Sequence, residues 1–159
     1  MARFEVGAED LLHSRFAVSP AFELDGLLRL MSRGGGRLLS AWSARLLPAF
    51  DELRRQTDLD AVLALQADHQ GAGFVAVPPV GMLQTWEDDL AAIRSTTLER
   101  ARAEIAECLA ARPTLAVDAR TQAVLDAPDV VARLAVALRP GMPFLLPSGL
   151  SCARSTSET

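Results

Sequence analysis

The sequence contains no lysine, no asparagine and no tyrosine, and only two isoleucines occur among its 159 residues. All 16 basic side chains are arginine, whereas alanine occurs 27 times and leucine 25 times. Residues with AT-rich codons are therefore scarce, which indicates a GC-rich coding sequence rather than selection for a basic surface. The formal charge of −4 is also opposite in sign to the net basic face that duplex-binding domains usually carry. The abundance of arginine alone gives no evidence for nucleic-acid binding.

Long apolar runs and patterned cysteines are also missing. No apolar run approaches the roughly 18 residues of a membrane-spanning helix, and the acidic N-terminus does not resemble a secretory signal. The two cysteines, Cys108 and Cys152, have no disulfide-framework or metal-binding spacing. We therefore expect a cytoplasmic protein that needs no membrane, metal or cofactor, with Cys108 as a small buried apolar side chain.

Half of the residues are hydrophobic, enough for a core, and most of them follow helical spacing. Ser19 and Pro20 have the residue types of an N-cap and a first helical position, and Leu24, Leu27, Leu28 and Met31 follow on one face. Further helices are predicted around Leu38–Leu46, stopping or restarting at Pro48, and after the candidate caps Asp58 and Thr96 or Thr97. Others are predicted at Trp86–Ile93, at 118–125 and at 128–138.

The predicted fold is therefore mainly α, with a single helical domain over residues 1–138. One short N-terminal strand is predicted at Arg3–Val6, where apolar and polar residues alternate. Residues 67–83 carry three glycines and Pro78-Pro79, which predicts a loop or an extended segment. On the helix after Thr97, Leu98, Ile105 and Leu109 are predicted to share the apolar face, and Arg100 is predicted to pair with Glu104.

Residues suited to catalysis or metal binding are few. His13 and His69 are the only histidines, and Asp68-His69 has no nucleophile at an informative spacing. A solvated loop position for His69 is favoured over a functional one. Glu87-Asp88-Asp89 is read as a favourable match to a helix dipole rather than as a cation site. We therefore predict no enzyme activity, no catalytic residue and no metal site.

The aromatic side chains offer one candidate binding site. Trp42, Phe50, Phe74 and Trp86 are candidates for the lining of a small-molecule pocket, while helical spacing favours core positions for most aromatics in the chain. Both readings stay open at this point, and the second candidate function of the chain is a free-standing helical module that binds a small molecule.

Several motifs occur in an order typical of one family. They are Arg3-Phe4-x-Val6, Glu9-Asp10-Leu11-Leu12, Arg15-Phe16-Ala17-x-Ser19-Pro20, Gly73-Phe74-Val75-Ala76 with Pro78-Pro79, residues 86–94 from Trp86 to Arg94, and Ala101-Arg102-Ala103-Glu104-Ile105. Over about residues 1–138 the chain resembles the N-terminal domain of actinobacterial ArsR-type regulators, which carry a C-terminal winged helix. The resemblance implies a regulatory or dimerisation domain of a transcription regulator, a cytoplasmic location and a homodimer, with an effector that it does not identify. It also implies that DNA is bound only through a winged helix that this sequence lacks.

The character of the sequence changes after Leu138. Residues 139–159 hold three prolines and end rich in serine and threonine, and no helix-ending glycine precedes the change. One hypothesis is that this segment is read out of frame, because a shifted back-translation gives a family-like Ala-Trp-His segment. The other is a natural irregular or disordered tail. Genomic sequencing of the locus distinguishes the two.

Overall fold

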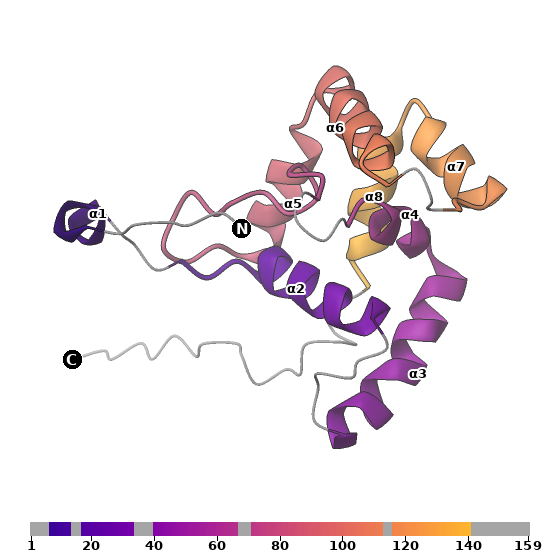
Figure 1. Cartoon of the computed structure of the whole chain (residues 1–159), viewed down its shortest axis with the longest axis horizontal. Helices are drawn as coiled ribbons and strands as arrows, with labels where there is room; N and C mark the ends of the chain where they lie inside the picture. The colour runs from indigo at the N-terminus through magenta and orange to yellow at the C-terminus, as the bar shows by residue number, and fades with distance from the viewer. Residues whose placement is uncertain (1–6, 14–16, 34–39, 67–70, 113–115, 141–159) are drawn as a thin grey trace, which may run out of the picture.

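The computed structural model describes residues 7–13, 17–33, 40–66, 71–112 and 116–140. Within these ranges the predicted helical fold is confirmed, because the chain forms helices and only one isolated β-bridge (Figure 1). The helices are α1 (Ala8–His13), α2 (Pro20–Ser32), α3 (Ser40–Gln56), α4 (Leu59–Ala64), α5 (Trp86–Arg94), α6 (Leu98–Ala110), α7 (Ala119–Asp126) and α8 (Val130–Leu138). The predicted strand at Arg3–Val6 and the segment 141–159 lie outside the described residues. None of the described helices is long and apolar enough to cross a membrane.

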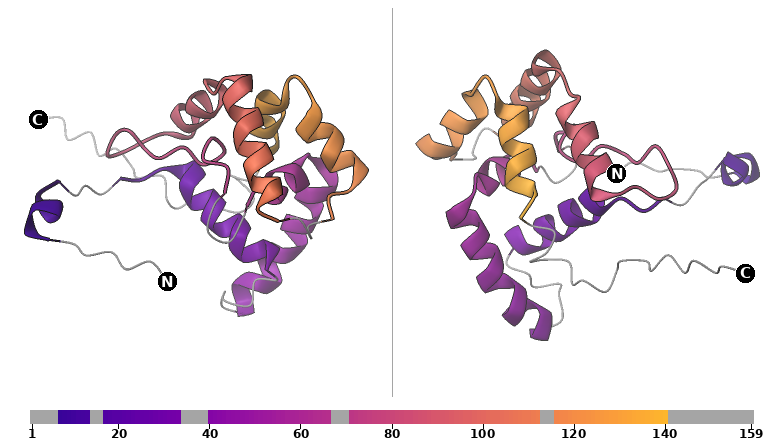
Figure 2. Two further views of the ribbon diagram at one scale, coloured as in Figure 1. Left: turned by 45° about the horizontal axis from the view of Figure 1, so that its top comes forward. Right: turned by 180° about the vertical axis from the view of Figure 1, so that it is seen from behind.

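Helix α8 lies at the centre of the core. It packs against α4, α5, α6 and α7, while α1 stands apart from the other helices in the views of Figures 1 and 2. Its buried side chains recur at helical spacing and are Val130, Leu134, Ala135, Ala137 and Leu138. Because apolar burial supplies most of the driving force for folding, α8 is the central support of α4, α5, α6 and α7, whereas α2 and α3 pack on α4 and α5.

The start of α2 is fixed to α5 by one buried carboxylate. Ser19 caps α2 by accepting from the Phe22 N–H at 3.2 Å, as the sequence predicted. Asp89 of α5, only 2% exposed, accepts from the Ser19 hydroxyl and, at 2.8 Å, from the Ala21 N–H. The Gln84 side chain donates to the same carboxylate at 2.7 Å. A buried carboxylate is tolerated when its oxygens are satisfied in this way.

The acids at the start of α5 thus have different roles. Thr85 and Asp88 form a capping box, in which each side chain binds the backbone N–H of the other residue. The Thr85 hydroxyl also donates to Asp88 Oδ2 at 2.7 Å, and this bond, together with that from the Thr85 N–H, holds the pKa of Asp88 below its usual 3.8. Glu87 is also in the first turn, in agreement with the predicted match to the helix dipole.

Helix α3 runs continuously through Pro48, where the sequence predicted a stop or restart. Pro48 is exposed, so its ring does not enter the core, although an interior proline removes one backbone hydrogen bond and crowds the carbonyl four residues earlier. Phe50 and Leu53, which follow it, are buried at 2% and 4% exposure. Their burial favours continuation of the helix across the proline.

The predicted face of α6 is rotated from the observed one. Leu98 is 43% exposed and Leu109 is only partly buried, whereas Ala101, Ile105 and Cys108 face the core. Leu98 is the first residue of the helix and lies at its free end, which explains its exposure. The cap at Thr97 and the pair between Arg100 Nε and Glu104 Oε1, at 2.8 Å, are confirmed.

Asp58 precedes α4 without capping it. Its side chain makes no cap hydrogen bond, and instead its Oδ2 accepts from Nε and an Nη of Arg133 at 3.0 and 2.8 Å. Arg120 lies 3.7 Å from the other carboxylate oxygen. The residue therefore joins the start of α4 to α7 and α8 by charge.

Candidate functional site

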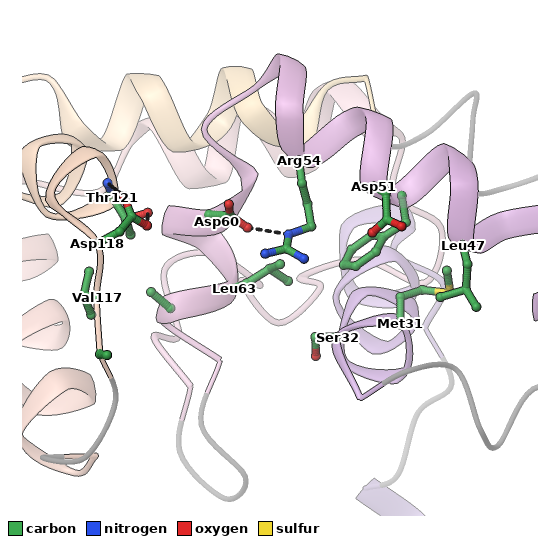
Figure 3. A pocket seen from close by; sticks show the side chains of 13 residues that line it. Met31, Ser32, Leu47, Asp51, Arg54, Asp60, Leu63, Val117, Asp118 and Thr121 are labelled. Atoms are coloured by element: carbon green, nitrogen blue, oxygen red, sulfur yellow. Dashed lines mark hydrogen bonds and ion pairs between the residues drawn. The ribbon is translucent and has the colours of Figure 1, made fainter.

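An open cleft lies between the C-terminal end of α2, the middle of α3, helix α4 and the segment that leads into α7 (Figure 3). Its volume is about 460 Å³, within the range of small-molecule sites. It is lined by Met31, Ser32, Leu47, Phe50, Asp51, Arg54, Asp60, Leu63, Ala64, Ala116, Val117, Asp118 and Thr121. Residues from four separate parts of the chain therefore meet in one concave surface.

The cleft combines an apolar floor with charged walls. Met31 and Phe50 are each 2% exposed, and Leu47, Leu63 and Val117 are partly buried around them. The exposed apolar area of this floor belongs mainly to Leu47, Leu63 and Val117, and covering that area favours the apolar part of a ligand. The charged residues of the lining are three aspartates and one arginine, which gives a formal charge of −2.

Arg54 occupies the middle of the cleft. Its Nε donates to Asp60 Oδ1 at 2.6 Å, and its guanidinium carbon lies 5.8 Å from the centre of the Phe50 ring. Figure 3 shows this pair between the Met31 end and the Thr121 end of the cleft. Asp60 therefore neutralises the one cationic side chain of the lining.

The other two aspartates of the cleft differ in their hydrogen bonds. Asp118 caps α7: its Oδ1 accepts from the Arg120 and Thr121 N–H groups, and its Oδ2 from the Thr121 hydroxyl at 2.7 Å. These hydrogen bonds, above all that from the Thr121 side chain, hold the pKa of Asp118 below its usual 3.8. Asp51 is exposed and makes no hydrogen bond or ion pair with any other described residue. It is the acid of the cleft that is left to bind a ligand.

The four aromatic candidates for a pocket have different positions. Phe50 lines the cleft, whereas Trp42 lies on α3 with half of its surface exposed and is not part of the lining. Phe74 is fully buried, and its N–H donates to Glu104 Oε2 at 2.9 Å. Trp86 is partly buried at the start of α5, and its buried Nε1 has no partner among the described residues. Phe50 is therefore the only one of the four in the cleft.

The remaining cleft residues carried no distinctive sequence signal. Asp51, Arg54 and Asp60 look like ordinary charged positions on helix surfaces, and only their packing around Phe50 brings them together. Asp118 was recognisable as a helix start but not as part of a cleft. Sequence periodicity identifies faces of single helices, and it contains no information on which faces meet.

Other candidate residues are less informative. His69 and Cys152 lie outside the described residues, and for His13 only the backbone in α1 is described. Cys108 is buried, as predicted, and burial raises the pKa of its thiol. In the described ranges no group of three or more histidine, cysteine, aspartate or glutamate side chains is arranged to hold a metal.

Two further hollows adjoin the core. One of about 430 Å³ lies beside Asp58, Arg133 and Val136, and one of about 360 Å³ lies beside Glu104, Glu107 and Cys108. In the first, the carboxylate of Asp58 is already bound by arginine, and in the second Glu104 is bound to Arg100 and to the Phe74 N–H. The cleft at Phe50 has the largest volume of these three hollows and combines an apolar floor with Asp51.

Comparison with known proteins adds no relative: no protein family, no curated protein and no solved structure matches this chain. The assignment of a function therefore rests on the cleft and on the motif order described above.

Proposed function

We propose that this chain is the effector-binding regulatory part of a transcription regulator, that it acts as a homodimer in the cytoplasm, and that it catalyses no reaction. The observation that carries the proposal is the cleft of about 460 Å³ at Phe50. Its volume is within the range of small-molecule sites, and seven of its thirteen lining residues are apolar. The regulatory context comes from the resemblance to ArsR-type regulators.

The position of the cleft supports a regulatory rather than a storage role. Its walls belong to α2, α3, α4 and the start of α7, and α4 and α7 both pack against α8. If these helices can adopt two arrangements, a ligand that binds one of them more tightly shifts the conformational equilibrium towards it. The effect reaches α8 and therefore the segment that follows it, where the resemblance places a winged helix.

The chemistry of the cleft favours one class of effector. The formal charge of −2 and Asp51, which has no partner among the described residues, favour a cationic group, and the partly exposed Leu63 and Val117 favour an apolar body. An amphipathic organic amine has both features, whereas a carboxylate of the same shape is repelled by the acidic walls. We propose such an amine as the effector.

A matched pair of probes tests the proposed effector class. Hexylamine and hexanoate have the same apolar length and opposite charge, so the amine is expected to raise the melting temperature of the full chain and hexanoate is not. Asp51→Asn is expected to weaken amine binding in isothermal titration calorimetry, and Leu63→Trp to abolish it by filling the cleft. Glu99→Gln removes one exposed carboxylate from α6, outside the cleft, and serves as the control for net charge. Equal binding of both probes, or no effect of either cleft substitution, contradicts the proposed site.

A free-standing small-molecule-binding module is the second candidate function, and the same cleft favours it. Only the regulatory candidate predicts that a ligand in the cleft changes the DNA affinity of a linked winged-helix domain. This chain alone is expected to give no sequence-specific complex in a gel shift at physiological salt. Specific binding by these 159 residues at nanomolar concentration contradicts the proposal that DNA is bound only through a winged helix.

A further inference from the structure

The surface beside the start of α2 exposes a group of large apolar side chains. Val18, Phe22, Val80, Met82 and Leu83 are each between 49% and 80% exposed. The loop that carries three of them projects from the helical body beside the start of α2 (Figures 1 and 2). We define these five residues as the apolar edge. Exposed apolar groups of this kind mark contact surfaces more often than scattered single residues do.

The apolar edge also contains an open strand edge. Val18 forms a parallel bridge with Leu83: the Val18 N–H donates to the Met82 carbonyl at 2.9 Å, and the Gln84 N–H donates to the Val18 carbonyl at 3.0 Å. Because successive residues of an extended segment direct their backbone groups to opposite sides, the N–H and carbonyl of Leu83 face away from Val18. Within the described part of the chain, neither makes a backbone hydrogen bond.

The loop is held in this extended shape by polar contacts behind it. The Gln84 side chain accepts from the Val80 N–H at 2.5 Å and donates to the buried Asp89 carboxylate. Asp89 in turn holds Ser19, next to Val18. The strand edge is therefore formed before any partner binds, which lowers the entropic cost of adding a strand.

The charge distribution identifies the partner. Residues 71–84 and residues 17–22 contain no charged side chain, although the chain carries 36 acidic and basic residues and a net charge of −4. Two copies of a net negative chain repel each other least where such an uncharged surface meets its own copy. A partner chosen by charge complementarity would require charges at this surface, and none are present in the two segments. A second copy of the same chain is therefore the occupant that this surface fits.

We propose that two copies of this chain pair through the apolar edge about a two-fold axis that passes beside Leu83. In this arrangement the two Leu83 residues lie opposite each other in antiparallel segments. Each Leu83 N–H donates to the carbonyl of the other, as in a hydrogen-bonded antiparallel pair. Val80, Met82 and Phe22 then pack across the axis, and the same surface serves both copies. The inference rests on the homodimer of the proposed function and assigns it a contact surface.

Sedimentation of the full chain over a concentration series tests the surface. The unmodified chain is expected to form a dimer, and Leu83→Asp to raise its dissociation constant by about tenfold or more, because two carboxylates are then placed against each other. Val136→Asp is the matched control, since Val136 is 62% exposed on α8, outside the apolar edge. Circular dichroism of both variants checks that the helical fold is retained. Val80→Asp repeats the test at a second position of the apolar edge.

A cross-linking experiment tests the axis itself. In a hydrogen-bonded antiparallel pair the two Cα atoms lie about 5.5 Å apart, within the range that a disulfide spans. Leu83→Cys, in a chain carrying Cys152→Ser, is therefore expected to form a disulfide-linked dimer under mild oxidation. Val136→Cys in the same background is expected to remain monomeric on a non-reducing gel.

Each outcome bears on a different part of the proposals. A dimer that Leu83→Asp and Val80→Asp leave intact overturns the apolar edge but not the homodimer. A chain that stays monomeric at all concentrations overturns both. Amine binding in the cleft is measured separately, so its presence or absence does not affect either result.

Discussion

The carboxylate of Asp89 accepts hydrogen bonds from the Ser19 hydroxyl at 3.0 and 3.1 Å, although 70 residues separate the two in the sequence. The same carboxylate binds the Ala21 N–H, so Asp89 completes the N-terminal end of α2 from within α5. A negative charge at a helix N-terminus is stabilised by the helix dipole as well as by these bonds. The two helices are therefore joined by one charged group in addition to their apolar contact.

Replacement of that carboxylate is expected to destabilise the fold. Asp89→Ala leaves the Ser19 hydroxyl and the Ala21 N–H buried without their acceptor, and we expect the free energy of unfolding to fall by about 2–4 kcal/mol. Urea denaturation followed by circular dichroism measures it. Asp88→Ala, at the exposed neighbouring carboxylate, is expected to cost less. A loss for Asp89→Ala no larger than that for Asp88→Ala contradicts a structural role for the buried carboxylate.

Acid is expected to destabilise the chain through the two capping aspartates. The pKa values of Asp88 and Asp118 are lowered in the folded chain, so both groups stabilise it above their unfolded pKa of about 4. This stabilisation is lost as the pH falls through the folded pKa. Thr121→Val removes the hydroxyl that Asp118 accepts from and should move the pKa of Asp118 upward, towards 3.8, in an NMR titration. An unchanged pKa in this variant would show that another group lowers it.

The two arginines around Asp58 are expected to contribute unequally. Arg133 reaches the carboxylate with two nitrogens, whereas Arg120 lies 3.7 Å away and is 64% exposed. We expect Arg133→Ala to lower the free energy of unfolding by about 1–2 kcal/mol, and Arg120→Ala by less than about 1 kcal/mol. A double-mutant cycle with Asp58→Ala isolates each coupling. Equal couplings for the two arginines would contradict the difference in their geometry.

Removal of the proline inside α3 is expected to stabilise the chain. Pro48 is exposed and lacks the N–H that the helix would use, so Pro48→Ala should raise the free energy of unfolding by about 1–3 kcal/mol. The greater freedom of the unfolded alanine chain offsets about 0.4–1 kcal/mol of this gain. Ala49→Gly, at the next position in the same helix, should act in the opposite direction. Thermal melting of the unmodified chain and the two variants is expected to rank their stabilities as Pro48→Ala above the unmodified chain, and the unmodified chain above Ala49→Gly.

The sequence was sufficient to place most helices, because their signals are local. Ser19-Pro20, Trp86, Thr97 and Asp118 mark helix starts that the structure has, and the apolar spacing of α2 and α8 survives as buried side chains. Pro48 was misleading, since a propensity of one residue was overridden by the burial of Phe50 and Leu53.

The cleft and the contacts of Asp58 and Asp89 were beyond local reasoning. The partners of Asp58 and Asp89 lie 75 and 70 residues away, and the lining of the cleft spans residues from Met31 to Thr121. Neither these long-range contacts nor the set of lining residues has a regular spacing in the sequence. Among the four aromatic candidates, only the packing of α3 against its neighbours distinguishes Phe50 from Trp42 as a lining residue.

The central position of α8 has a consequence for the folding of the chain during its synthesis on the ribosome. Synthesis proceeds from the N-terminus, so α4, α5, α6 and α7 emerge before the described helix on which all four pack. Until Val130–Leu138 has left the exit tunnel, their apolar faces have no central partner, and the nascent chain exposes them to other proteins. Completion of the core therefore follows the synthesis of α8, and until then the apolar faces of the preceding helices are open to chaperones.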